Sequence, residues 1–91
     1  MARLSRGEFE SIGRVLGEPR RYEILRQIGA AGIETCVAIQ RKQFVSPATL
    51  SHHIKALKLS NLVRTIRVGK FLHLSVNRTV LRAYLNQLAE I

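Results

Sequence analysis

The clearest structural signal in the sequence is the stretch Val45-Ser46-Pro47-Ala48-Thr49-Leu50-Ser51-His52-His53-Ile54-Lys55-Ala56-Leu57. Ser46 is a residue type that caps helix N-termini, and Pro47 is pre-shaped for the first helical position. Apolar side chains follow at helical spacing, at Leu50, Ile54 and Leu57. The opposite, polar face carries Thr49, Ser51, His52 and Lys55. The stretch therefore predicts a helix with one buried and one exposed face.

Three further helices are predicted before this one. The first covers Glu8–Leu16 and ends at Gly17, with apolar residues at Phe9, Ile12 and Leu16. The second begins at Pro19 and is broken by Gly29-Ala30-Ala31-Gly32, with apolar residues at Tyr22, Ile24, Leu25 and Ile28. The third covers Cys36–Gln43, with Thr35 as its N-cap and Val37 and Ile39 as apolar contacts.

The pattern changes after Asn61, which can close the quoted helix. Leu62–Val68 is rich in β-branched residues, Gly69-Lys70 suits a turn, and Phe71–Val76 alternates like a returning strand. Asn77 can cap a last helix, whose apolar stripe is Leu81, Tyr84, Leu85 and Leu88. The order of four helices, two strands and a fifth helix predicts a mainly α fold with a β-hairpin wing. This is a winged helix-turn-helix, expected to form a single domain over residues 1–91.

Positive charge is concentrated in the second half of the chain. The sequence has 15 Lys and Arg against 6 Asp and Glu, which gives a net charge of +9. No acidic residue lies between Thr35 and Ala89, whereas nine basic residues do: Arg41, Lys42, Lys55, Lys58, Arg64, Arg67, Lys70, Arg78 and Arg82. Surfaces charged only for solubility usually mix both signs, so this distribution favours a polyanionic partner.

The two helices around Phe44 match the parts of a helix-turn-helix, because they are short, closely joined, and polar on the outer face of the second. Small polar side chains at the start of that second helix allow close approach to base edges and phosphates in the major groove. Its free N–H groups favour a phosphate, and basic residues of the hairpin are suited to backbone phosphates or a minor groove. The predicted contacts with double-stranded DNA are Ser46, Pro47, Ala48, Thr49, Ser51, His52, Lys55, Arg64, Arg67 and Lys70.

Three segments resemble the ArsR-type winged-helix regulators, in the right order and over nearly the whole chain. They are Leu16–Leu25, Val45–Leu57 with the following Asn61-Leu62-Val63, and the wing Arg67–Phe71. The resemblance implies a homodimeric bacterial or archaeal repressor that occludes a promoter until an effector, unidentified here, loosens it. In the turn Gln43-Phe44-Val45 the chain departs from the family, where a glycine is common, and Pro47 and Ala48 replace side chains that are often polar.

The chain also departs from the metal-sensing members of that family. Members that sense metals in the third helix carry a Cys-x-Cys, whereas this chain has Cys36 alone; members that use the last helix carry Asp and His pairs, which Asn77–Glu90 lacks. His52 and His53 point about 100° apart on a helix and do not readily chelate one ion. We expect His52 to contact DNA, His53 to be partly packed, and the protein to hold no metal or other cofactor.

An enzyme is not predicted, because no Ser/His/Asp arrangement, phosphate-binding glycine loop or pair of buried carboxylates can be assembled. Two alternatives to a DNA-binding repressor stay open at this point. One is a winged-helix module that binds RNA or another protein, although few aromatic residues are available to stack on bases. The other is a redox-responsive regulator that uses Cys36, although a small buried thiol is the commoner role.

Location is expected to be cytoplasmic. A single cysteine fits a reducing compartment, since Cys36 has no partner for an internal disulfide. The sequence has no run of about 18 apolar residues, and its first six residues lack the apolar stretch of a signal peptide. No contact with a membrane is therefore predicted.

A homodimer is predicted from the two terminal helices. A domain of 91 residues has limited room to bury the apolar stripes of both against itself. The predicted interface residues are Phe9, Ile12, Leu16, Leu81, Tyr84, Leu85 and Leu88. Pairing across a two-fold axis would set two recognition helices about 34 Å apart, one turn of B-DNA, which matches a palindromic operator.

Overall fold

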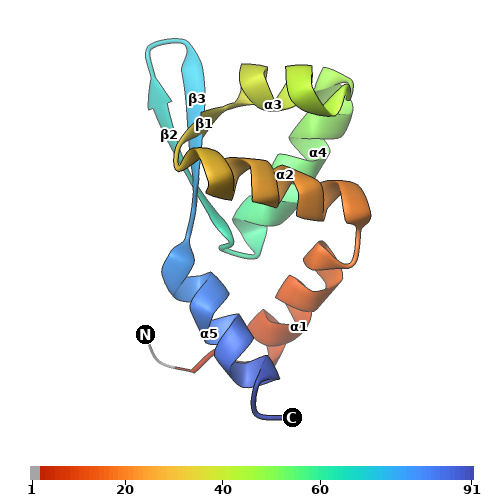
Figure 1. Cartoon of the computed structure of the whole chain (residues 1–91), viewed down its shortest axis with the longest axis vertical. Helices are drawn as coiled ribbons and strands as arrows, with labels where there is room; N and C mark the ends of the chain where they lie inside the picture. Colours follow the sequence, from red (N-terminus) through yellow and green to blue (C-terminus); the bar gives the residue numbers. More distant parts are fainter. Residues whose placement is uncertain (1–2) are drawn as a thin grey trace.

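The computed structural model describes residues 3–91 (Figure 1). Its elements, in chain order, are α1 (Arg6–Leu16), α2 (Pro19–Ala31), β1 (Glu34–Thr35), α3 (Cys36–Gln43), α4 (Pro47–Leu59), β2 (Val63–Val68), β3 (Phe71–Val76) and α5 (Arg78–Leu88). The predicted winged helix-turn-helix, with four helices, a hairpin and a closing helix, is confirmed. The structure adds one element, the two-residue strand β1.

Strand β1 extends the hairpin into a three-stranded antiparallel sheet with the order β1-β3-β2. Glu34 pairs with Leu74 and Thr35 with His73. Two residues are too few to show the alternation by which a strand is predicted, which is why the sequence indicated Thr35 only as a helix cap. That role is confirmed as well, since the Thr35 hydroxyl accepts a hydrogen bond from the Ala38 amide at 3.2 Å.

Two helix ends differ from the prediction. Helix α1 begins at Arg6 rather than Glu8, because Ser5 and Glu8 form a capping box in which each side chain accepts a hydrogen bond from the other's amide. Helix α2 continues through Gly29 and ends only at Gly32, which has a φ of 81°. Alanine stabilises helices strongly enough to carry α2 past Gly29, so the predicted break there was wrong.

The end of α4 is also set by backbone conformation. The helix ends at Leu59, Ser60 is its C-cap, and Asn61 then adopts a φ of 62° that turns the chain into β2. Asparagine tolerates this left-handed conformation better than most residues. Asn61 therefore turns the chain away from the helix axis, although it lies two positions after Leu59, the last helical residue.

The apolar core lies between the helices and the inner face of the sheet. It consists of Leu4, Ile12, Val15, Ile24, Leu25, Ile28, Ile39, Leu50, Ile54, Leu57, Leu62, Val63, Leu74 and Val80. All three residues of the predicted α4 stripe are among them. Val37 and Tyr22 were expected to be buried and are instead about half exposed, because helical spacing alone does not say where the apolar face of a helix ends.

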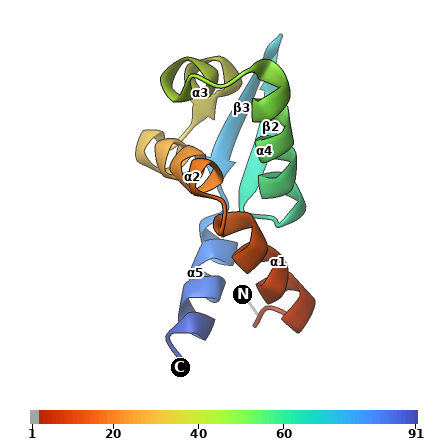
Figure 2. The ribbon, with the colours of Figure 1, turned by 90° about the vertical axis from the view of Figure 1, so that its right-hand side faces the viewer.

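The molecule has two distinct ends. The β2–β3 hairpin is here called the wing. Figure 1 shows α3 and the tip of the wing at one end of the molecule, and α1 with α5 at the other. Figure 2 shows α4 on one side of the strands and α2 on the other. At the α1/α5 end, the Leu4 amide donates to Gln87 Oε1 at 2.7 Å, and the Phe9 and Tyr84 ring centroids are 4.8 Å apart. None of the helices in the described part of the chain combines the length and hydropathy needed to span a bilayer.

Candidate nucleic-acid interface

Helices α3 and α4 are joined by the three residues Phe44, Val45 and Ser46. Ser46 Oγ accepts a hydrogen bond from the Thr49 amide at 3.1 Å and donates one to Thr49 Oγ1 at 2.9 Å. The predicted cap is therefore present, and Pro47 occupies the first helical position. These contacts fix the backbone at the N-terminus of α4, where the side chains are short and exposed.

Helix α4 has the two faces that its sequence predicts. Leu50, Ile54 and Leu57 are buried, and α4 contacts α2, α3 and β2. The seven predicted DNA contacts at the N-cap and on the outer face of α4 are all exposed. They are Ser46, Pro47, Ala48, Thr49, Ser51, His52 and Lys55. The N-terminal half of α4 therefore exposes short or polar side chains on a helix that fits the width of the DNA major groove.

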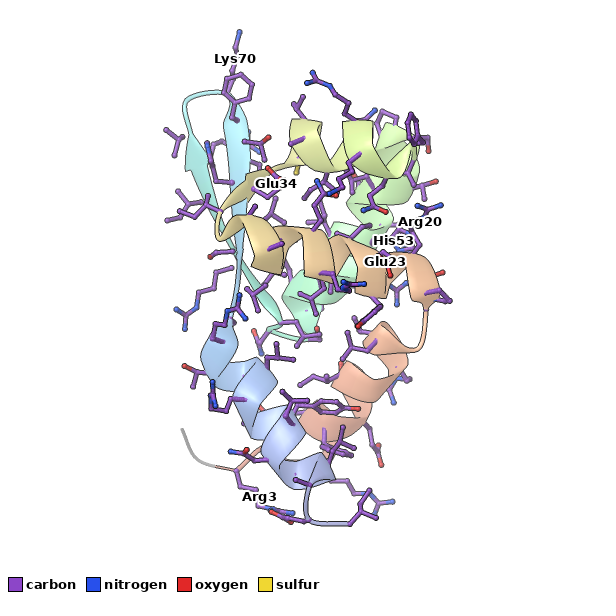
Figure 3. All side chains as sticks on the ribbon, viewed as in Figure 1. Arg3, Arg20, Glu23, Glu34, His53 and Lys70 are labelled. Carbon is purple, nitrogen blue, oxygen red and sulfur yellow. The ribbon has the colours of Figure 1, made fainter. Side chains whose placement is uncertain are left out.

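The three basic residues predicted to contact DNA from the hairpin are exposed but do not lie together. Residues 64 and 67 are an odd number of positions apart on β2, so their side chains lie on opposite faces of the wing. Arg67 lies toward α3, close enough for its charge to act on the Cys36 thiol. Arg64 lies in a groove of about 730 Å³ with Lys58, beside the last turn of α4. Lys70 is at the wing tip (Figure 3).

The position of Arg64 separates it from the other predicted contacts. Helix α4 has 13 residues, so its two ends are roughly 18 Å apart at the usual rise per residue. Arg64 adjoins the C-terminal end, whereas Arg67 and Lys70 follow the wing toward its tip. The structure thus groups Arg67 and Lys70 at the end of the molecule that also carries α3, and it does not group Arg64 with them.

The positive charge of this surface has no internal counter-charge. The ion pairs among residues 3–91 are Arg3–Glu90, Arg6–Glu10 and Arg26–Glu23, and His53 Nε2 lies 3.9 Å from Glu18 Oε2. None of the lysines and arginines of α3, α4 or the wing has a carboxylate partner within the described residues. Their field is therefore directed outward, as expected for a surface that binds a polyanion.

A polar network holds α3 against α2, and it was not predicted from the sequence. Gln27 is buried among apolar neighbours, and its Nε2 donates to Glu34 Oε2 at 3.1 Å and to the Ala38 carbonyl at 3.3 Å. Gln27 Oε1 accepts from Gln43 Nε2 at 2.9 Å, and Arg20 donates to the Gln43 side chain at 3.0 Å. The one signal in the sequence is a glutamine placed between Ile24 and Ile28 on the buried face of α2.

His53 and His52 occupy opposite environments. His53 is only 7% exposed, and its Nδ1 accepts a hydrogen bond from Arg21 Nε at 3.3 Å, while its Nε2 lies 3.9 Å from Glu18 Oε2. Figure 3 shows His53 beside the N-terminal end of α2. The predicted packing of His53 is confirmed, and His52 faces solvent. His53 therefore connects α4 to α2, whereas His52 lies on the exposed outer face of α4.

Burial lowers the pKa of His53 below its ordinary value of 6.5, and the nearby positive charges of Arg21, His52 and Arg20 act in the same direction. Glu18 opposes this shift without reversing it. The pKa of Glu18 is itself lowered, chiefly by the hydrogen bond from the Arg21 amide. The neutral imidazole is thus the form that fits this position, since Nδ1 must accept from Arg21.

The predicted interface residues of the terminal helices divide into three groups. Ile12 is 1% exposed and belongs to the chain's own core, so its prediction as a dimer contact was wrong: it has no surface left for a partner. Phe9, Leu16, Leu81 and Tyr84 are half-buried. Leu85 and Leu88 are 53% and 38% exposed, so part of the α5 stripe remains uncovered.

Cys36 is half-buried at the start of α3. Burial raises the pKa of its thiol, and the charge of Arg67 offsets this only in part. A raised pKa disfavours the thiolate, which is the reactive form of cysteine. In the described residues, His, Cys, Asp and Glu side chains do not gather in groups of three or more that would suit a metal ion.

The fold and the exposed recognition helix define a winged helix-turn-helix protein. No protein-family model matches the chain. An arsenical resistance operon repressor of Staphylococcus xylosus is 35% identical over 88 residues, which cover 97% of this chain and 83% of that protein. The chain belongs to the ArsR family of transcriptional regulators, and the resemblance found in its sequence is confirmed.

Solved structures share the fold. An ArsR-like transcriptional regulator from Rhodococcus matches with a TM-score of 0.82 at 23% identity, covering 92% of this chain and 78% of that chain. A homodimeric winged helix-turn-helix DNA-binding domain from Mycobacterium bovis, described as a possible ArsR-family regulator, matches with a TM-score of 0.77 at 26% identity. That match covers 99% of this chain and 90% of the other.

The environment of His53 predicts a pH dependence of stability. Its folded-state pKa lies below 6.5, so between that value and 6.5 the unfolded chain binds a proton that the folded chain does not. We expect the free energy of unfolding, measured by urea denaturation, to fall as the pH is lowered from about 7 to about 5. His53→Gln should flatten this dependence, whereas His52→Gln should leave it in place. A wild-type slope in His53→Gln would contradict the assignment.

Proposed function

We propose that this chain represses transcription as a homodimer that binds an operator in duplex DNA. In this proposal α4 enters the major groove, and Arg67 and Lys70 of the wing contact the adjacent backbone or minor groove. The observation that carries it is the outer face of α4, which is polar, exposed at every predicted contact, and surrounded by cations without carboxylate partners. A helix of this kind fits the dimensions of the major groove.

The contacts divide by chemistry. Ser46, Pro47, Ala48 and Thr49 form a helix N-terminus whose free N–H groups suit a phosphate. Ser51 and His52 follow on the outer face, at the depth where side chains meet base edges. Lys55, Arg67 and Lys70 carry positive charge on long side chains and suit the phosphate backbone. Arg64 keeps a predicted role at the margin of the interface, beside Lys58.

Repression by a dimer is supported by the relatives and by the terminal helices. The Staphylococcus xylosus relative is named a repressor, and the Mycobacterium bovis domain is described as homodimeric. In this chain Leu85 and Leu88 leave apolar surface on α5, next to half-buried Phe9 and Tyr84. A two-fold axis through this end would place two α4 helices on successive turns of a palindromic site.

The proposed regulator is a single cytoplasmic domain over residues 1–91 and has no assigned effector. Its likeness to arsenical repressors does not extend to a thiol pair in α3, where Cys36 stands alone. Metal sites of the zinc or arsenic type need several convergent ligands, and soft metals favour paired thiolates. The proposal therefore includes no metal response.

Selection of bound duplexes from a random pool tests the function directly. We expect an enriched palindrome, and binding to it should weaken steeply with salt because bound cations release counterions. With about five phosphates contacted per protomer, log K against log salt should fall with a slope of about −4 to −5 per protomer. Failure to enrich any duplex, or binding that is flat across salt, would remove the basis for the proposal.

Single substitutions should separate base contacts from phosphate contacts. Ser51→Ala and His52→Ala should reduce the preference for operator over random DNA by about 1–3 kcal/mol. Lys55→Ala and Arg67→Ala should weaken binding to both DNAs alike. Arg14→Ala removes the same charge from the exposed end of α1 and serves as the control, with binding close to wild type. Titration of each variant against both duplexes distinguishes the two classes, and an unchanged preference in the first pair would overturn the assignment.

The dimer interface is tested on α5. Leu88→Glu places a charge on the uncovered apolar stripe and should give monomers with much weaker operator binding, since an isolated half-site contact loses the partner's contribution. Asn86→Glu adds the same charge to an exposed polar position of the same helix and should remain dimeric. Sedimentation velocity at micromolar concentration measures both. A monomeric wild type, or a dimeric Leu88→Glu, is the result that the model does not allow.

A further inference from the structure

Phe44 combines two unfavourable features. It is the C-cap of α3 with a φ of 54° and a ψ of 43°, and its side chain is 93% exposed. Side chains with a Cβ rarely adopt this left-handed conformation. The other positive-φ positions among residues 3–91 are Gly32, Asn61 and Gly69, all residue types that tolerate it. Phe44 is the exception, and glycine at this position would relieve both the backbone strain and the apolar exposure.

The ring of Phe44 receives little from the rest of the chain. It lies outside the apolar core, and it borders a shallow hollow of about 400 Å³ with Val37, Gln40, Arg41 and Val45. Residues held in a strained backbone conformation are concentrated at functional sites. The question is therefore which partner meets this end of α3.

The surroundings of Phe44 indicate DNA. Phe44 is two residues before Ser46, the N-cap of α4, so its surface is continuous with the proposed major-groove contacts. Arg41 and Lys42 in the last turn of α3 are exposed, and neither has a carboxylate partner within residues 3–91. This positive surface is at the same end of the molecule as the wing tip (Figure 1). A polyanion fits this positive charge, whereas an apolar protein surface with few acidic residues would not.

We propose that Phe44 is a specificity-determining residue that packs against the C5-methyl group of a thymine in the operator. The inference rests on the proposed function and deepens it. In the major groove only thymine presents a methyl group, and apolar side chains are the ones that distinguish it. Phe44 supplies such a group in the turn just before the recognition helix, whose first residues, Pro47 and Ala48, offer few hydrogen bonds of their own.

The first experiment compares Phe44→Gly and Phe44→Asn with the wild type. Both replacements suit a positive φ, so we expect the melting temperature to stay the same or to rise by a few degrees, up to about 4 °C. Operator affinity should fall by about fivefold or more, the range of one lost base contact. Because the lost contact is apolar, the salt slope should not change. Leu59→Ala removes another exposed apolar side chain, at the far end of α4, and should bind like the wild type.

The second experiment removes single methyl groups from the DNA. Each thymine of the selected operator is replaced in turn by uracil, which keeps the base pair and deletes the C5-methyl. Because a palindrome presents the same thymine to each protomer, one replacement should weaken wild-type binding by about the square root of the factor seen for Phe44→Gly. Replacing both symmetry-related thymines should give the full factor, and neither change should affect that variant's binding. Wild-type affinity in both Phe44 variants overturns the inference, and so does a set of uracil operators that all bind the wild type normally. If no duplex is enriched at all, it is the proposed function that has failed.

Discussion

The burial of one face of α4 is the constraint on which the rest of the structure depends. Leu50, Ile54 and Leu57 fill the space between α2, α3 and the sheet, and in a domain of this size each such side chain is a substantial part of the core. With that face fixed, the residues on the opposite side of the helix must point outward. The arrangement that stabilises the fold therefore also presents Ser51, His52 and Lys55 to a partner.

Polar contacts add to this apolar packing in fixing the positions of α3 and α4. Gln27 is bonded at once to Glu34, to the α3 backbone and to Gln43, so it fixes α3 relative to α2 and to the start of the sheet. His53 does the same for α4 through Arg21. A buried polar group that lost its partner would be costly, which makes these contacts specific to one geometry. The angle of the helix-turn-helix is thus set by a few side chains that never meet the partner.

The sequence predicts the parts of this structure that depend on local patterns, and it misses the parts that depend on tertiary pairing. Ser46, Pro47 and the α4 stripe act within one helix, so the fold class and the outer face of α4 follow from them. Strand β1 exists only because β3 is beside it, and Gln27 is polar in an apolar stripe because Glu34 and Gln43 converge on it. Ile12 was assigned to a partner because periodicity gives the apolar face of a helix without saying what covers it.

The two ends of the molecule place opposite demands on stability. The unpaired cations of α3, α4 and the wing repel one another, and α5 leaves Leu85 exposed at the other end. The first feature destabilises an isolated 91-residue chain, whose core is small, and the second leaves apolar surface that contributes nothing to its stability. A polyanion relieves the first and a second copy relieves the second, and each stabilises the folded state by mass action. In the proposed dimer two α4 helices would bind the same duplex, so DNA would also hold the two copies together and each partner would strengthen the binding of the other.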